Sequence, residues 1–103
     1  MSRVDALRKQ LDGPRDGALL RFSLGSALLE DGKSAEAIVQ LNRAVTFDAD
    51  YSAAWKLLAR AQAGSGDTAA AIESYEHGIA AAQRRGDKQA EKEMTVFLRR
   101  LVR

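Results

Sequence analysis

Apolar residues recur every three or four positions along most of the chain, the spacing that gathers them on one face of an α-helix. This pattern predicts six helices near residues 3–11, 18–31, 34–47, 51–64, 68–84 and 87–102. At two of the breaks, Gly32 and Gly66 are suited to the left-handed conformation that ends a helix. Ser34 is expected to cap the helix that follows the first of these breaks. The chain is therefore expected to be all helical.

The break near residue 50 contains neither glycine nor proline. Asp48 disfavours a continuing helix because its side chain can bond to nearby backbone. Asp50 is predicted to cap a new helix that starts at Tyr51. Trp55, the only tryptophan, follows one turn later. We expect its side chain to fill the seam between successive helix pairs rather than to form a ligand platform.

The four central helices repeat with a period of 34 residues. Aligning residues 17–50 with residues 51–84 gives identical residues at the pairs Leu24/Leu58, Ala27/Ala61, Gly32/Gly66, Ala35/Ala69, Ala37/Ala71 and Ile38/Ile72. Further pairs match in size, among them Gly25/Ala59, Leu41/Tyr75 and Ala44/Gly78. Small residues thus recur where two helices must approach closely, and large ones where side chains must interlock.

This period and pattern resemble the tetratricopeptide repeat, a helix–turn–helix unit with a W-x2-L-G-x2-Y…A-x3-F signature. The residues that carry the resemblance are Leu24, Gly25, Leu28, Ala37, Leu41 and Ala44 in the first unit, and Trp55, Leu58, Ala59, Ala71, Tyr75 and Gly78 in the second. The chain departs from the pattern where Arg21 stands for tryptophan, Gln62 for tyrosine and Ala49 for proline. The resemblance implies a short right-handed α-solenoid of antiparallel helix pairs.

The chain is expected to form one domain, with an N-terminal helix in residues 1–12, repeats at 17–50 and 51–84, and a C-terminal capping helix in 86–103. Stacked repeats leave apolar faces open at both ends, and both terminal helices carry an apolar stripe that can cover one. The stripes are Val4, Leu7 and Leu11, and Ala90, Met94, Phe97, Leu98 and Leu101. Either helix could instead bind a partner. Val96 points away from its stripe.

The sequence offers no catalytic, metal-binding or cofactor-binding group. There is no cysteine, and the single histidine, His77, is expected to be solvated on an outer helix face. The segment GSGD at 64–67 is too short for a phosphate-binding loop. The N-terminus lacks an apolar core of signal-peptide length, and no apolar run is long enough to span a membrane. We therefore expect a non-enzymatic, cytoplasmic protein without a membrane partner.

The resemblance implies an adaptor whose concave groove, lined by the first helix of each unit, holds a peptide or partner helix. The groove residues so implied are Leu19, Phe22, Ser26, Leu29, Ala53, Lys56, Arg60 and Ala63. Lys56 and Arg60 have no acidic partner on their own helix, which leaves them available for an acidic or mixed acidic–apolar segment. Phe22 and Leu29 either add apolar area to the groove or receive the N-terminal helix. Phe22, Ser26 and Leu57 do not match the clamp with which some family members hold a C-terminal carboxylate.

Two other functions remain open. With barely two repeats, the protein could complete its core as a homodimer through the terminal helix. The C-terminal segment 84–103 carries seven Lys/Arg against three Asp/Glu and could meet nucleic acid. Nucleic-acid binding is the least favoured function, because acids are mixed into this segment and interleaved aromatic residues are missing.

Overall fold

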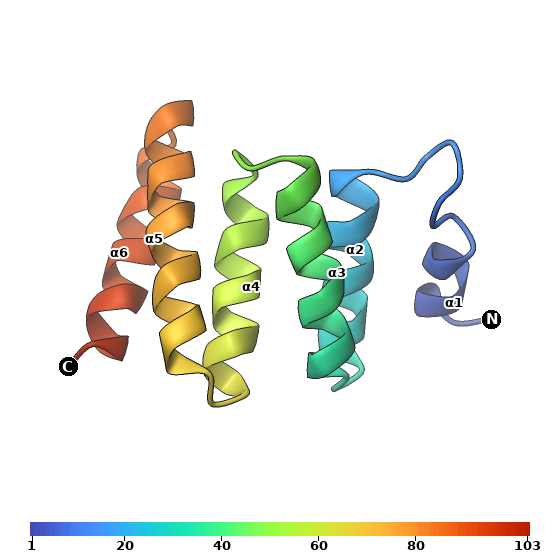
Figure 1. The fold of residues 1–103 in the computed structure, drawn as a ribbon, viewed down its shortest axis with the longest axis horizontal. Coiled ribbons are helices and arrows are strands. Elements are labelled where there is room, and N and C mark those ends of the chain that lie inside the picture. The colour runs from blue at the N-terminus through green and yellow to red at the C-terminus, as the bar shows by residue number, and fades with distance from the viewer.

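The computed structural model describes residues 1–103 as six α-helices and no strand (Figure 1). The helices are α1 (Arg3–Arg8), α2 (Ala18–Glu30), α3 (Ser34–Phe47), α4 (Ser52–Gly64), α5 (Thr68–Arg85) and α6 (Lys88–Leu101). The predicted helices are confirmed to within one residue at each end, except that α1 ends three residues early and turns fill the gap before α2.

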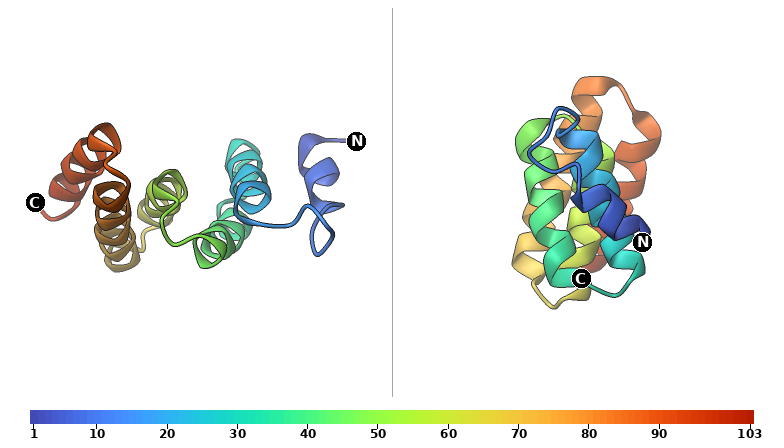
Figure 2. Two further views of the ribbon diagram at one scale, coloured as in Figure 1. Left: turned by 90° about the horizontal axis from the view of Figure 1, so that it is seen from above. Right: turned by 90° about the vertical axis from the view of Figure 1, so that its right-hand side faces the viewer.

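The helices stack as antiparallel neighbours into an elongated body of 41 × 29 × 18 Å. Seen from above, α2, α4 and α6 lie in one layer, and α3 and α5 lie in the other (Figure 2). Helix α2 packs on α3, helix α4 packs on α5, and helix α5 packs on α6. The contact between α3 and α4 joins the two repeats. Helices α2 and α6 also touch α4 directly. The expected all-α solenoid of helix pairs is confirmed.

Small residues let the paired helices approach closely. A Cβ atom added to Gly25 would lie 2.7 Å from Leu41 Cγ, so α2 and α3 meet without room for a methyl group. A Cβ on Gly78 would lie 2.9 Å from Trp55 Cβ and 2.5 Å from Met94 Sδ, because α5 is wedged between α4 and α6. All twelve residues of the repeat signature except Trp55 are buried.

Left-handed glycines end the first helix of both repeats, as predicted. Gly32 has φ +74°, and the next residue, Lys33, donates its N–H to the Leu28 carbonyl at 2.8 Å. Gly66 has φ +88° at the equivalent place in the second repeat. The prediction that Ser34 caps α3 is wrong, because Ser34 is already the first helical residue and no side chain caps this helix.

The turn between α3 and α4 is held by side chains in a different way from the one predicted. Asp48 does end α3, and its Oδ1 accepts the N–H of Asp50 at 3.0 Å. The predicted cap by Asp50 is wrong, because α4 starts at Ser52 without a side-chain cap. The Asp50 carboxylate instead accepts a hydrogen bond from Arg84 Nε of α5 at 2.6 Å, which ties the turn to the second repeat.

Trp55 packs against the core cluster shared by α3 and α4, so its predicted place in the seam is confirmed. Its ring is only half-buried, and its Nε1 donates to the Ala49 carbonyl at 2.8 Å. The prediction that His77 is simply solvated needs correction. The imidazole is exposed, but it stacks on the Trp55 ring with 4.9 Å between ring centroids and 20° between planes.

Arg21 occupies the place of the missing first tryptophan. Its side chain is buried, and Nε and Nη2 donate to the two carboxylate oxygens of Asp16 at 2.8 and 2.6 Å. Nη1 donates to Gln40 Oε1 of α3 at 3.0 Å. These bonds to Arg21, with a further one from a backbone N–H, hold the pKa of the Asp16 carboxyl well below its usual range. The loop before α2 is thereby fastened to the first repeat.

Both terminal helices use their apolar stripes inside the molecule, as predicted for lids. Val4 is buried in the cluster that contains Leu24 and Leu28, and α1 packs on α2, with Arg8 also paired to Glu36 of α3. Met94 is fully buried against Tyr75 at the other end. Asp87 caps α6 by accepting the N–H of Ala90, and Val96 is exposed, as expected for a residue outside the stripe.

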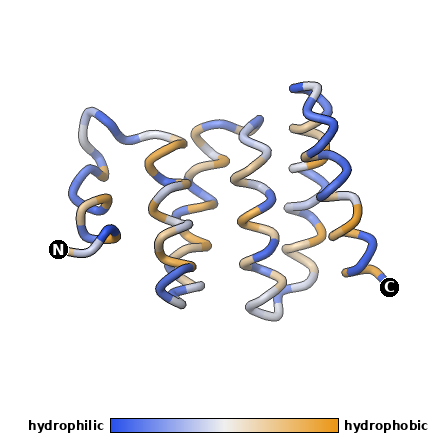
Figure 3. The backbone as a smooth tube through the Cα atoms, turned by 180° about the vertical axis from the view of Figure 1, so that it is seen from behind, coloured by the Kyte–Doolittle hydropathy of each residue, from blue (hydrophilic) through white to orange (hydrophobic).

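The face opposite that of Figure 1 shows where polar residues gather along the backbone (Figure 3). The last turn of α5 and the turn into α6 are hydrophilic and exposed. Helix α5 has 18 residues against 13 in α4, so its end extends beyond its partner.

Candidate partner-binding groove

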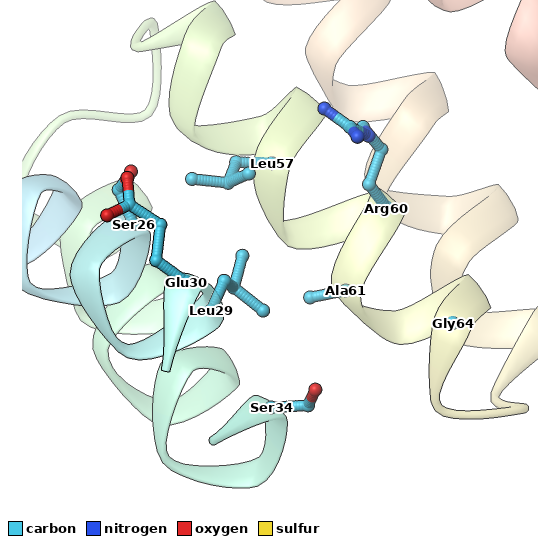
Figure 4. A pocket seen from close by; sticks show the side chains of 8 residues that line it. All are labelled: Ser26, Leu29, Glu30, Ser34, Leu57, Arg60, Ala61 and Gly64. Atoms are coloured by element: carbon cyan, nitrogen blue, oxygen red, sulfur yellow. The ribbon is translucent and has the colours of Figure 1, made fainter. Parts of the chain in front are cut away.

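A hollow of ≈ 410 Å³ lies between α2 and α4, in the layer predicted to line the groove (Figure 4). Eight residues line it: Ser26, Leu29, Glu30, Ser34, Leu57, Arg60, Ala61 and Gly64. Figure 4 shows the Leu29 and Leu57 side chains facing one another across the hollow. Ser34, at the start of α3, contributes a hydroxyl at one end. The hollow therefore combines an apolar pair with polar groups around it.

The charges around the hollow are not equally available. Glu30 is paired with Arg3 of α1, with 3.6 Å between Nη1 and Oε1. Arg60 is exposed and forms no ion pair or hydrogen bond within the protein. Burial raises the pKa of the nearby Tyr75 phenol, and the positive charge of Arg60 opposes that rise. Arg60 is thus the unpaired charge of this hollow.

The structure brings three of the eight predicted groove residues together, namely Ser26, Leu29 and Arg60. Leu19 lies elsewhere, beside a second hollow between α1 and α2, and is 68% exposed. The Phe22 ring packs on Tyr51 with 5.0 Å between ring centroids. Phe22 is therefore covered by the turn before α4 rather than by the N-terminal helix.

The expectation that Lys56 stays unpaired is wrong. Its Nζ lies 3.8 Å from Oε2 of Glu93, which belongs to α6. Sequence spacing could exclude a partner on the same helix but not one on a neighbouring helix. Ala53 is exposed and Ala63 half-buried, and neither lines the hollow.

Sequence reasoning missed Leu57, Ala61 and Gly64, which form the α4 wall of the hollow together with Arg60. Residues 57, 61 and 64 recur at spacings of four and three, so they share one helix face. The prediction placed the face one residue away, at 56, 60 and 63. Leu57 was the available signal, because it is a large apolar residue outside the repeat signature.

The structure shows no group of three or more His, Cys, Asp or Glu side chains that could hold a metal ion. None of the six helices is both long and apolar enough to cross a membrane. The hollow between α2 and α4 contains no histidine or cysteine, and its one carboxylate is already paired.

Comparison with known proteins bears on the chain as a whole. It is 50% identical over 100 residues to a TPR repeat-containing protein of Pseudomonas aeruginosa, covering 97% of this chain and 95% of that protein. A solution structure of a Bordetella parapertussis protein matches 99% of this chain and 89% of its own, with a TM-score of 0.82 and 43% identity. A crystal structure of MamA matches 96% of this chain and 64% of its own, with a TM-score of 0.72 at 22% identity, which speaks for the fold alone. No family model matches the sequence.

Proposed function

Because the chain belongs to the tetratricopeptide repeat family, we propose that it is a protein-interaction module that binds a partner segment in the hollow between α2 and α4. Proteins of this family generally mediate protein–protein interactions and are generally non-enzymatic scaffolds. The partner segment proposed is an extended or helical stretch that carries both an apolar and an acidic side chain.

The observation that carries the proposal is the unpaired Arg60 beside the apolar pair Leu29 and Leu57. A carboxylate of the partner would pair with Arg60, and an apolar side chain would lie between the two leucines. The hydroxyl groups of Ser26 and Ser34 supply adaptable hydrogen-bonding partners around them. Lys56 adds less than the sequence suggested, since the carboxylate of Glu93 lies 3.8 Å from its Nζ.

Selection of peptides from a random displayed library on the immobilised protein tests this proposal. We expect enrichment of sequences with acidic and large apolar residues one helical turn or less apart. A selected peptide should bind Arg60→Glu about tenfold more weakly than the parent, because one attractive charge pair becomes a repulsive one.

Arg99→Glu in α6 is the matched control, because it reverses the same charge on an exposed face away from the hollow. Its affinity for the selected peptide should equal that of the parent protein. If only the α6 variant loses binding, the partner contacts the C-terminal helix and the groove proposal is wrong.

Self-association through the terminal helix receives less support. The apolar stripe of α6 packs inward, with Met94 fully buried and Phe97 against the same cluster. The outward face keeps Val96 as its exposed large apolar residue before the chain end. That area is small for a stable homodimer.

A further inference from the structure

A second pocket, of ≈ 260 Å³, lies on the opposite side of the solenoid, where α3 and α5 flank α4. It is lined by Asn42, Trp55, Gln62, Ala70, Glu73, Ser74 and His77. Figure 2 shows that α3 and α5 form the layer away from α2 and α6. This pocket, here called the outer pocket, is therefore separate from the groove between α2 and α4.

The floor of the outer pocket is a built polar site. Gln62 is 9% exposed, and its amide Oε1 accepts a hydrogen bond from Ser74 Oγ at 2.6 Å. The other amide atom, Nε2, has no partner in the protein, and it is not sealed from solvent. Because a serine hydroxyl can donate or accept, Ser74 can instead accept from Nε2 and leave Oε1 free. In both arrangements one atom of a nearly buried amide is open to the pocket.

The walls add acceptors and a single charge. Glu73 of α5 is the one formally charged residue of the pocket, and no ion pair or hydrogen bond engages its carboxylate. Asn42 of α3 presents an exposed amide without a partner for its side chain. No lysine or arginine lines the pocket. Glu73 therefore favours a ligand group with positive charge, and the amide oxygen of Asn42 can accept a hydrogen bond from it.

A flat aromatic surface completes the outer pocket. The Trp55 and His77 rings stack nearly parallel at its edge, and the Trp55 Nε1 is already bonded to the Ala49 carbonyl. The aromatic pair therefore offers a planar wall on which the Trp55 donor is already used, while the imidazole of His77 keeps its own ring nitrogens. Planar cations stack on such walls, which an ammonium group does less well.

We propose that the outer pocket binds the guanidinium group of an arginine side chain presented by a partner protein. Glu73 pairs with the guanidinium, and the carbonyl oxygen of Asn42 accepts a further N–H group. The carbonyl oxygen of Gln62 accepts another when the amide is flipped so that Ser74 accepts from Nε2, and the aromatic pair covers the guanidinium plane. Arginine is preferred to lysine because the acceptors lie on three different helices, and the guanidinium fork can reach several at once.

The single tryptophan gives a direct probe of this site. We expect an acetylated and amidated Gly-Arg-Gly tripeptide to shift the Trp55 indole N–H signal saturably in a ¹⁵N–¹H spectrum of the full chain. The matching Gly-Lys-Gly peptide should bind several-fold more weakly, and Gly-Asp-Gly should not bind.

Glu73→Gln should weaken binding of the Gly-Arg-Gly peptide about tenfold, because it removes the pairing charge. Glu76→Gln is the matched control on the exposed face of the same helix and should bind like the parent. Arg60→Glu should also bind normally, so failure of the groove proposal and failure of this one are separately visible. No saturable shift, equal binding of the lysine peptide, or an equal loss in Glu76→Gln would each overturn the proposal.

Discussion

At the scale of single residues, the chain shows how a charged side chain can stand where its family uses tryptophan. Arg21 is buried, but its guanidinium is satisfied by Asp16 and Gln40, and no buried side-chain polar atom in the protein lacks a partner. A buried arginine without partners would lower the free energy of unfolding by several kcal/mol. An arginine whose hydrogen bonds are satisfied is tolerated, and its bonds hold the neighbouring segments in place. The loop of residues 12–17 folds back against α2. It thereby places the Asp16 carboxylate beside Arg21, which stands where the family has tryptophan.

The Arg21–Asp16 pair makes stability depend on acidity in a defined direction. The pKa of Asp16 is lower in the folded protein than its unfolded value of about 3.9. The pair therefore contributes fully above about pH 4 and loses its contribution as pH falls through the folded value. We expect Asp16→Asn to lower the melting temperature at neutral pH and to flatten its decline below pH 4, measured by circular dichroism.

Asp12→Asn is the control for that measurement. Asp12 is the outer acid of the same cluster, 3.5 Å from Arg21 Nη2, with a side chain 90% exposed. Exposed ion pairs contribute little, so its melting temperature and pH dependence should stay close to those of the parent. Equal effects in the two variants would show that loop charge in general, and not the bond to Arg21, sets the stability.

Close approach at a single glycine gives a second prediction at this scale. Gly25→Ala should destabilise the protein by about 1–3 kcal/mol, because the new methyl group overlaps the fully buried Leu41 side chain. Gly64→Ala is the matched control, since a Cβ there meets nothing within 4 Å. Urea unfolding of both variants distinguishes them. Parent-like stability of Gly25→Ala would mean that α2 and α3 can move apart at little cost.

At the scale of elements, the sequence pattern was enough to place α2 to α6 within one residue at each end, but not to identify every residue that caps them. Helices α3 and α5 begin where predicted because apolar stripes and left-handed glycines mark their limits in the sequence. The predicted cap at Ser34 was wrong because the helix already includes Ser34, and the one at Asp50 was wrong because its carboxylate has a partner that only the fold reveals. For Asp50 that partner is Arg84, 34 residues away in the chain.

The same reason limited prediction of the candidate groove. The resemblance to the repeat indicated which helices line the groove. Ser26, Leu29 and Arg60 could therefore be predicted from the sequence. Which face of α4 turns toward the hollow depends on how the helices pack. The structure turns Leu57 toward it, where the sequence analysis had placed Lys56. The ion pair between Lys56 and Glu93 joins two helices whose contact the sequence does not specify.

Helix α6 covers the end of the solenoid, and its contribution to stability can be tested. Met94→Ala should destabilise the protein by about 2–5 kcal/mol, because it removes a fully buried side chain that contacts α5. Val96→Ala on the exposed side of the same helix should change stability by no more than about 0.5 kcal/mol. Thermal unfolding of the two variants compares them. Equal, small effects would show that α6 is not needed to close the core.

At the scale of the whole molecule, the solenoid presents two different surfaces. The layer of α2, α4 and α6 carries a hollow with an apolar pair and an unpaired cation, while the layer of α3 and α5 carries a pocket with an unpaired carboxylate. The two proposals together predict that the molecule holds two partner segments of opposite charge at once. Because both surfaces lie on packed helices, neither needs a large rearrangement to bind.

The central claim is that the hollow between α2 and α4 receives a partner segment. Titration of ¹⁵N-labelled protein with a selected acidic–apolar peptide tests it most directly, because every backbone amide reports separately. We predict that the largest shifts occur at Ser26, Leu29, Leu57, Arg60 and Ala61, with those at Lys88, Lys92 and Arg99 unchanged. Shifts confined to α6, with the α2 and α4 signals unmoved, would contradict the account.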